Sequence, residues 1–329
     1  MRHFLLIVSM ILFLSACESK RDNIVVNQLT KELSISAFSD SSFFSLIPCM
    51  VEYEGDIYIS DIIRNDIVVL DSLLLLKKNI ASSGRGPEEI ISGSYFEISN
   101  DTILIGDVGN RRYQLFNING NHIKSISFQG LNIDRYSSLR FIYNDGILYT
   151  TSRDEDEKAI VGIDIEKREI INTFGDKYQF ENEFQKIIRN KRNLSLLDNY
   201  IISTSNNMPY IEKYDSAGNL LEKYSLLNIA EIKETIQYIE TQNYNENQYF
   251  ILFQDSYLFR DKLYILLSYK TNSDNWMVNN IFEFDVKDKI FLIRKLILPS
   301  RIYMSFCVNS EWIYAFNDVE VLIEKIRLN

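Results

Sequence analysis

Residues 101–120 read DTILIGDVGNRRYQLFNING, and this stretch determines how the rest of the chain is interpreted. An apolar run at 102–106 follows an acidic residue, and a polar turn separates it from a second apolar run at 113–116. An Asn-Gly turn then leads toward a further strand. Short apolar runs separated by turn residues are typical of consecutive antiparallel β-strands.

The first apolar run of this unit recurs along the whole chain. Its copies are Asp56–Ser60, Thr102–Gly106, Gly146–Thr150, Asn199–Ser203, Lys262–Leu266 and Trp312–Phe316. Their spacing is 46, 44, 53, 63 and 50 residues. A second run follows each copy, at Val68–Asp71, Gln114–Asn117, Val161–Asp164, Glu212–Asp215, Phe282–Asp285 and Val321–Glu324. A third apolar run precedes each copy, at Met50–Val51, Phe96–Ile98, Arg140–Ile142, Leu194–Leu196, Tyr257–Leu258 and Phe306–Val308.

Six units of four strands predict an all-β protein, a six-bladed β-propeller with four-stranded blades. A two-domain β-sandwich is the alternative, but it explains the regular spacing less well. The last unit stops soon after its third strand, and residues 24–38 alternate enough to supply the missing outer strand. Between blades four and five, Ile229, Ile232, Ile236 and Ile239 recur at helical spacing and predict a short helical insertion.

The composition excludes several classes of protein. The chain has 329 residues, 46% of them hydrophobic, with 45 acidic against 35 basic residues and a net charge of −10. This is enough apolar content for a core and too much for a disordered chain. A net negative chain without a basic block lacks the charge that attracts a polyanion, so we expect no nucleic-acid partner.

The first residues carry an export signal. The apolar run at 4–14 is too short for a membrane span and suits a signal peptide. It ends in Leu14-Ser15-Ala16-Cys17, which resembles the lipobox of bacterial lipoproteins. That resemblance implies cleavage before Cys17 and lipidation of its thiol; the alternative is an ordinary secretory cleavage site. The predicted domains are a signal peptide at 1–16, a lipidated tether at 17–28 and one propeller at 29–329, anchored in the cell envelope at the outer membrane.

Two motifs resemble known propeller families. Asp107, Asn110, Arg111, Phe116 and Gly120 are similar to the NHL-type repeat, in which a strand ends in Asp, a turn carries Asn-Arg and a second strand ends in an aromatic residue. Unit one has a partial copy, and units three to six lack the motif. The resemblance implies a propeller fold.

The second motif is GRGPEE at residues 84–89. It resembles the Gly-x-Gly-Pro-x-Glu motif of six-bladed β-propeller lipoproteins of the Bacteroidetes type. That family implies the fold and the location, and little chemistry.

Candidate ligand-binding residues are Arg85, Glu88, Arg111 and Arg112, beside the junction of blades one and two. A structural role in the turn and between blades is the alternative for all four. Cleavage of the signal peptide leaves one histidine, His122, so we expect neither a zinc site nor a catalytic triad, and we predict no metal and no cofactor.

Two further cysteines, Cys49 and Cys307, fall in the innermost strands of blades one and six. These blades are neighbours across the ring closure, and the cell envelope permits oxidation. The sequence thus raises the hypothesis of a disulfide between them, with two buried thiols as the alternative.

The predicted function is that of a ligand-binding or protein-interaction module, without an assigned catalytic residue. The membrane, through the lipid anchor, and a glycan, peptide or envelope protein are the expected partners. The alternative is a carboxylate-based lyase or hydrolase acting on a polysaccharide at the propeller mouth. Two or three carboxylates with an Arg or Tyr in one pocket favour the enzyme, and an aromatic or apolar face favours binding.

Overall fold

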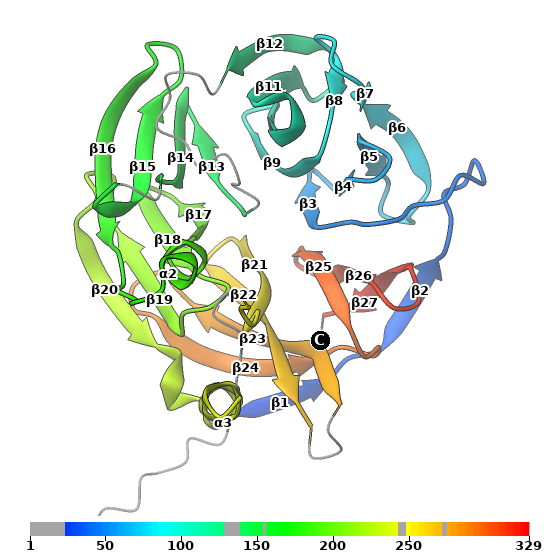
Figure 1. Ribbon diagram of the computed structural model, residues 1–329. Coiled ribbons are helices and arrows are strands. Elements are labelled where there is room, and N and C mark those ends of the chain that lie inside the picture. Colours follow the sequence, from blue (N-terminus) through cyan, green and yellow to red (C-terminus); the bar gives the residue numbers. More distant parts are fainter. Residues whose placement is uncertain (1–23, 128–138, 154–155, 243–247, 272–274, 329) are drawn as a thin grey trace, which may run out of the picture.

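A computed structural model describes residues 24–127, 139–153, 156–242, 248–271 and 275–328 (Figure 1). Six antiparallel sheets stand around a central axis, and the chain passes through them in sequence order. This confirms the six-bladed propeller of four-stranded blades that the repeats predict.

The strands are given from the innermost to the outermost in each blade. Blades one and two consist of β3 (Cys49–Tyr53), β4 (Asp56–Asp61), β5 (Asp66–Leu70), β6 (Leu76–Ile80) and β9 (Gly93–Ser99), β10 (Thr102–Asp107), β11 (Arg112–Asn117), β12 (His122–Ser127). Blades three and four consist of β13 (Ile142–Asn144), β14 (Ile147–Thr151), β15 (Lys158–Asp164), β16 (Glu169–Asp176) and β17 (Asn193–Leu197), β18 (Tyr200–Thr204), β19 (Tyr210–Tyr214), β20 (Leu220–Ser225). Blades five and six consist of β21 (Phe253–Phe259), β22 (Lys262–Lys270), β23 (Trp276–Asp285), β24 (Phe291–Ile297) and β25 (Tyr303–Val308), β26 (Trp312–Asn317), β27 (Leu322–Arg327), β2 (Lys31–Ile35).

Tight hairpins join the two innermost strands of each blade. In blade one Glu54 and Gly55 have φ of 53° and 86°, and in blade three Asp145 and Gly146 have φ of 49° and 82°. Positive φ at both central positions is the geometry of a type I′ turn, which favours Asn, Asp and Gly. The acidic and Gly residues that mark the repeats therefore have a conformational cause.

The N-terminal strand β2 closes the ring. It pairs antiparallel with β27, with Ser34 opposite Glu324 and Ile35 opposite Ile323. Blade six thus takes three strands from the C-terminus and its outer strand from the N-terminus, as predicted for residues 24–38.

The stretch expected to be a tether, residues 17–28, ends in a further strand, β1 (Val25–Gln28). This strand pairs in parallel with β24, so that Val25 lies opposite Arg294 on the rim of blade five. The pairing covers the exposed edge of that blade, which would otherwise offer unpaired backbone groups. Cys17 and the signal peptide lie outside the described residues.

The core is divided into layers that lie between neighbouring blades. Ile67 and Val69 of blade one pack with Ile103 and Phe116 of blade two, for example. Similar clusters join blades two to three, three to four and four to five, and the largest cluster joins blades five, six and one. The layers hold the blades in a fixed ring around the axis.

Two α-helices are present in the described residues (Figure 1). Helix α3 (Ala230–Glu240) is the predicted insertion between blades four and five, and its Ile232 is fully buried against blade five. Helix α2 (Glu183–Arg189), between blades three and four, was not predicted; Asn182 caps it by accepting a hydrogen bond from the Gln185 N–H. Neither helix is long and apolar enough to cross a membrane.

The antiparallel order gives the propeller two different faces. One face, the hairpin face, carries the turns between first and second strands and between third and fourth strands. The opposite face, the loop face, carries the connections between blades that the structure describes, including residues 81–92 and both α-helices.

Candidate functional site

The six innermost strands place two rings of side chains around the axis. The last residues before the inner hairpins are Tyr53, Ser99, Asn144, Leu197, Phe259 and Asn309. Alternate residues of a strand face the same side, so equivalent positions form levels. The residues two positions earlier in the chain form one level, here called the Glu97 level: Val51, Glu97, Ile142, Ser195, Tyr257 and Cys307. The residues four positions earlier form a second level, here called the Arg140 level: Cys49, Tyr95, Arg140, Asn193, Asp255 and Ser305.

Arg140 of blade three reaches across the axis to Asp255 of blade five. Its Nε and Nη2 lie 2.9 Å from the two carboxylate oxygens, which is a bidentate ion pair. Nη2 also donates to the Met50 carbonyl of blade one at 3.3 Å and to the Phe306 carbonyl of blade six at 3.2 Å. The guanidinium therefore links four blades at the centre of the ring.

The ion pair is buried, with Arg140 8% and Asp255 3% exposed. Burial acts to lower the pKa of Arg140, but the charge and hydrogen bonds of Asp255, together with the neighbouring Cys49 and Tyr95, outweigh it and the pKa is raised. Asp255 also accepts hydrogen bonds from the backbone N–H groups of Ser256 and Phe306. Every charge at this level is thus paired, which a buried ion pair requires.

A cavity of about 90 Å³ lies beside the ion pair on the ring axis. Its lining residues are Val51, Glu97, Arg140, Leu194, Ser195, Leu196, Tyr257 and Leu258. They come from the innermost strands of blades one to five, so the cavity is a product of the closed ring. Four of these residues are aliphatic and four, Glu97, Arg140, Ser195 and Tyr257, carry polar or charged groups.

Glu97 is the distinctive group of this cavity. Among the described residues its carboxyl has no hydrogen-bond or ion-pair partner. Burial raises the pKa of Glu97 to about 8, although the positive charge of Arg140 acts in the opposite direction. A carboxyl with a raised pKa in a cavity marks a candidate functional site.

The predicted site at the junction of blades one and two is held together by Asp107. This fully buried carboxylate accepts hydrogen bonds from Asn110 Nδ2, Arg112 Nε and the Ile91 N–H, each at 2.8 Å. Arg112 Nη2 donates to the carbonyls of Gly86 and Glu89 at 2.5 and 2.9 Å. The motif at 84–89 and the motif at 107–112 therefore form one structural unit, in which Arg112 fastens the connecting loop.

The other three predicted residues lie on the surface of this unit. Arg85, Glu88 and Arg111 are exposed on the loop face, and within the described part of the chain their side chains have no hydrogen-bonding partner. Arg111 has a φ of 54° and ends the short 3-10 helix at Val108–Asn110. The geometry brings the four predicted residues into one region but leaves only these three open to a partner.

Asp107→Ala is expected to lower the free energy of unfolding by about 2–3 kcal/mol, because it leaves the partly buried guanidinium of Arg112 and the Ile91 N–H without their acceptor. The loop at 84–89 should then loosen, and trypsin should cut after Arg85 faster than in the wild type. Urea unfolding and a digestion time course measure the two effects. Glu88→Ala is the control and should change the stability by less than about 0.5 kcal/mol. Equal digestion rates in all three proteins contradict the structural role of Asp107.

Cys49 and Cys307 lie on neighbouring inner strands, β3 and β25, and both are fully buried free thiols in the structure. Burial raises the pKa of Cys49 to about 11. Both groups are therefore unreactive in this form. Their pairing as a disulfide stays a prediction.

His122 lies in the outer strand of blade two, where Nε2 is 3.1 Å from Ser125 Oγ and the ring packs on Phe116. This is a structural environment far from the axis. In the described residues, no group of three or more His, Cys, Asp or Glu side chains is placed to hold a metal ion.

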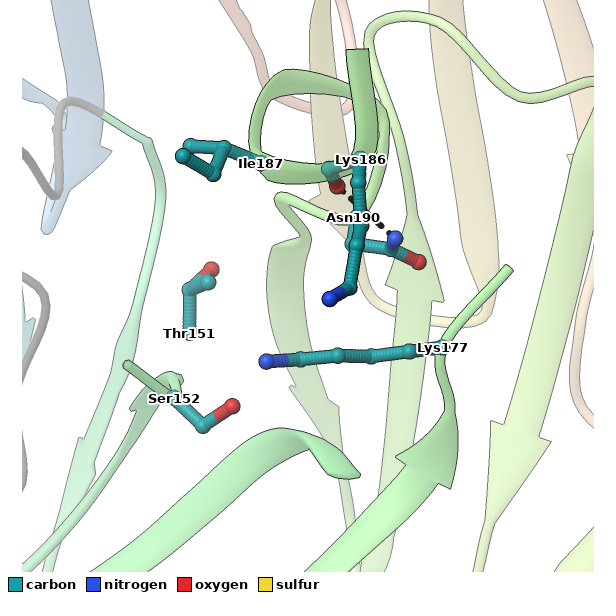
Figure 2. A pocket seen from close by; sticks show the side chains of 6 residues that line it. All are labelled: Thr151, Ser152, Lys177, Lys186, Ile187 and Asn190. Carbon is teal, nitrogen blue, oxygen red and sulfur yellow. Dashed lines mark hydrogen bonds between the residues drawn. The ribbon is translucent and has the colours of Figure 1, made fainter. Parts of the chain in front are cut away.

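A second hollow lies between α2 and blade three. Figure 2 shows the Lys177 and Lys186 side chains extending toward the same space, with Thr151, Ser152, Ile187 and Asn190 around it. Its volume of about 10 Å³ leaves room for about one water molecule. Lys177 donates to the Arg153 carbonyl at 2.6 Å and Lys186 lies 3.5 Å from Glu183, so both ammonium groups are already engaged. The central cavity is the stronger candidate.

Sequence reasoning missed Glu97, Arg140 and Asp255. Glu97 and Arg140 fall inside runs counted only as apolar strands, although a charged residue within the innermost strand of a propeller is itself a signal. Aligning the six units on their hairpins would have placed Arg140 and Asp255 on one level. Their contact across the axis follows only from the closed ring.

The fold and the ring-axis cavity define a six-bladed β-propeller, and solved structures of this class are similar to it. A protein described as exported, from Bacteroides fragilis, matches over 93% of this chain and 100% of its own, with a TM-score of 0.62 and 13% identity. A member of the DUF4221 family from Bacteroides vulgatus matches over 91% and 97%, with a TM-score of 0.55 and 14% identity.

A streptogramin B lyase also matches, over 92% of this chain and 97% of its own, with a TM-score of 0.51 and 13% identity. At these identities the similarities show the fold alone. No protein-family model and no curated protein matches the chain.

Proposed function

We propose that this protein is an exported, lipid-anchored propeller that binds a small ligand in its central cavity. The observation that carries the proposal is the carboxyl of Glu97, which faces a cavity on the ring axis without a partner in the described chain. Ligand sites are concave and combine apolar side chains with convergent polar groups, and this cavity has both.

The anchored location is part of the same proposal. It is supported by the lipobox-like Leu14-Ser15-Ala16-Cys17 and by the similarity in structure to a protein described as exported. Three acyl chains on Cys17 would hold the propeller at the outer membrane, since one chain gives only reversible binding. The NHL-like character of blade two is likewise a proposal, supported by the contacts of Asp107 with Asn110 and Arg112.

Binding is favoured over catalysis by the number of free carboxyl groups. Glycoside hydrolysis uses two carboxyl groups on either side of the bond. Of the described residues lining the cavity, only Glu97 carries a carboxyl, and the nearby Asp255 is held by Arg140. The lyase named among the similar structures shares only the fold, so its activity is not carried over.

The loop face of blade two is the proposed contact for an envelope partner, such as a glycan, a peptide or a protein. Arg85, Glu88 and Arg111 are exposed there on a loop that Arg112 holds in place. A rigid scaffold with exposed charged side chains suits recognition on a loop.

The binding function is tested by comparing the wild type with a variant in which a larger side chain fills the cavity. The purified full-length protein is incubated with a small-molecule extract of its host cells, separated by gel filtration and analysed by mass spectrometry for retained compounds. Ser195→Phe should abolish retention because the new ring occupies the cavity, and Ser216→Phe in an exposed turn should retain the same compound. Retention that is the same in both variants, or none in the wild type, contradicts a cavity site.

Cys17→Ser should lower the mass of the protein by the mass of the lipid and release the protein from membranes. An unchanged mass and an unchanged membrane fractionation contradict the anchor.

A further inference from the structure

We infer that the ligand of the central cavity is a small organic cation, whose ammonium group pairs with the Glu97 carboxylate while its alkyl part contacts the leucine walls. This inference rests on the proposed function and names the chemistry of the same site. Three observations carry it: the charge balance of the two levels, the nature of the walls and the size of the cavity.

The charge balance favours a cation. Around Glu97, the groups able to carry charge are Arg140 and Asp255 from blades three and five, Cys49 and Cys307 from blades one and six, and Tyr95 and Tyr257 from blades two and five. The first two form an ion pair, and the thiol and phenol groups are neutral because burial raises the pKa of each. Ionised Glu97 therefore leaves the cavity with one unpaired negative charge.

A carboxylate that is largely shielded from water and has no counter-charge is unfavourable, so a cation gains more here than a neutral ligand does. An anion gains little, because the charge of Arg140 is already paired by Asp255 in a bidentate contact. A divalent metal ion is disfavoured as well, since Ca²⁺ takes six to eight oxygen ligands and this cavity offers a single carboxyl among its described lining residues.

The walls and the volume set the size of the ligand. Val51, Leu194, Leu196 and Leu258 give the cavity an aliphatic part beside its polar groups, which suits a ligand with a charged end and a short alkyl chain. A volume of about 90 Å³ has room for about six water molecules, or for an amine of a few carbon atoms. The unpartnered Ser195 hydroxyl, on the Glu97 level, is a second acceptor for the ammonium protons.

Protons compete with the cation for Glu97. Because burial raises the pKa of this carboxyl to about 8, the site is mostly protonated at pH 6 and mostly ionised at pH 9. An alkylammonium with a pKa near that of lysine, about 10.4, stays charged over this range. Its affinity should therefore be about a hundredfold higher at pH 9 than at pH 6.

The probe is n-propylammonium, measured by isothermal titration calorimetry with the full-length protein at pH 6 and pH 9. We expect one saturable site at pH 9, about a hundredfold weakening at pH 6, and at least a tenfold loss of affinity in Glu97→Gln at pH 9. Glu234→Gln, which removes an exposed carboxyl of helix α3, should bind like the wild type. Sodium ion at equal ionic strength and n-propanol should not compete.

The outcomes separate this inference from the proposed function. If Glu97→Gln binds n-propylammonium like the wild type, or if sodium ion displaces it, the ammonium site is wrong. If Ser195→Phe loses a retained compound that is neutral or anionic, the cavity binds a ligand and only the cation inference fails. If the wild type binds no probe at pH 9 and retains no compound from the extract, both fail.

Discussion

Asp255→Ala is expected to lower the free energy of unfolding by about 3–5 kcal/mol, because it leaves the buried charge of Arg140 without a counter-charge. The guanidinium would keep the carbonyls of Met50 and Phe306, a weak contact with the Cys49 thiol at 3.8 Å and the face of the Tyr257 ring, none of which carries a negative charge. The alanine also removes the acceptor of two backbone N–H groups. Urea unfolding followed by tryptophan fluorescence measures the loss.

Two matched variants show whether the charge is the cause. Asp176→Ala breaks the exposed ion pair with Lys158, in which the Asp176 side chain is 87% exposed, and should change stability by at most about 1 kcal/mol. The double variant Arg140→Met with Asp255→Leu removes both buried charges and should be more stable than Asp255→Ala alone, since apolar replacements of a buried pair are often neutral. A double variant less stable than Asp255→Ala, or equal small losses for the Asp255 and Asp176 variants, contradicts the buried-charge explanation.

The ion pair of Arg140 and Asp255 also shows which features of the structure the sequence can predict and which it cannot. The propeller could be predicted because turn chemistry and strand periodicity are local: Glu54-Gly55 and Asp145-Gly146 adopt the positive φ that their residue types favour. The closing strand β2 could be predicted as well, because blade six lacks an outer strand and the N-terminal segment alternates. Arg140 and Asp255 are 115 residues apart and meet only where the ring closes. No local pattern contains that contact.

The structure also differs from the sequence-based predictions at helix α2, at strand β1 and among the predicted site residues. Helix α2 has seven residues, too few for a clear apolar periodicity, and it forms with the help of the Asn182 cap. The predicted tether at 17–28 ends in a strand, because Val25 and Val26 suit a strand and pair with the open edge of β24. Among the predicted site residues, Arg112 proves to be fully engaged by the protein, while Arg85, Glu88 and Arg111 remain exposed.

The cavity group Glu97 should make the stability of the protein depend on pH. Its pKa in the folded state is about 8, above the ordinary value of 4.5 expected for the unfolded chain. Below pH 4.5 both states are protonated and the group contributes no difference. Between pH 4.5 and 8 the unfolded state ionises while the folded state stays neutral, so stability falls as pH rises, by less than about 1.4 kcal/mol per pH unit because Glu97 keeps some exposed surface. Above pH 8 the loss is complete.

Glu97→Gln removes this titration and keeps the size of the side chain. The variant should equal the wild type at pH 4 and exceed it by a few kcal/mol at pH 9, as measured by urea unfolding at both pH values. Glu88→Gln, an exposed carboxyl on the same blade, should follow the wild type throughout. A parallel pH dependence in Glu97→Gln and the wild type would mean that Glu97 ionises freely in the folded protein. The proton competition proposed for the cavity would then fail with it, because the same desolvated carboxyl underlies both effects.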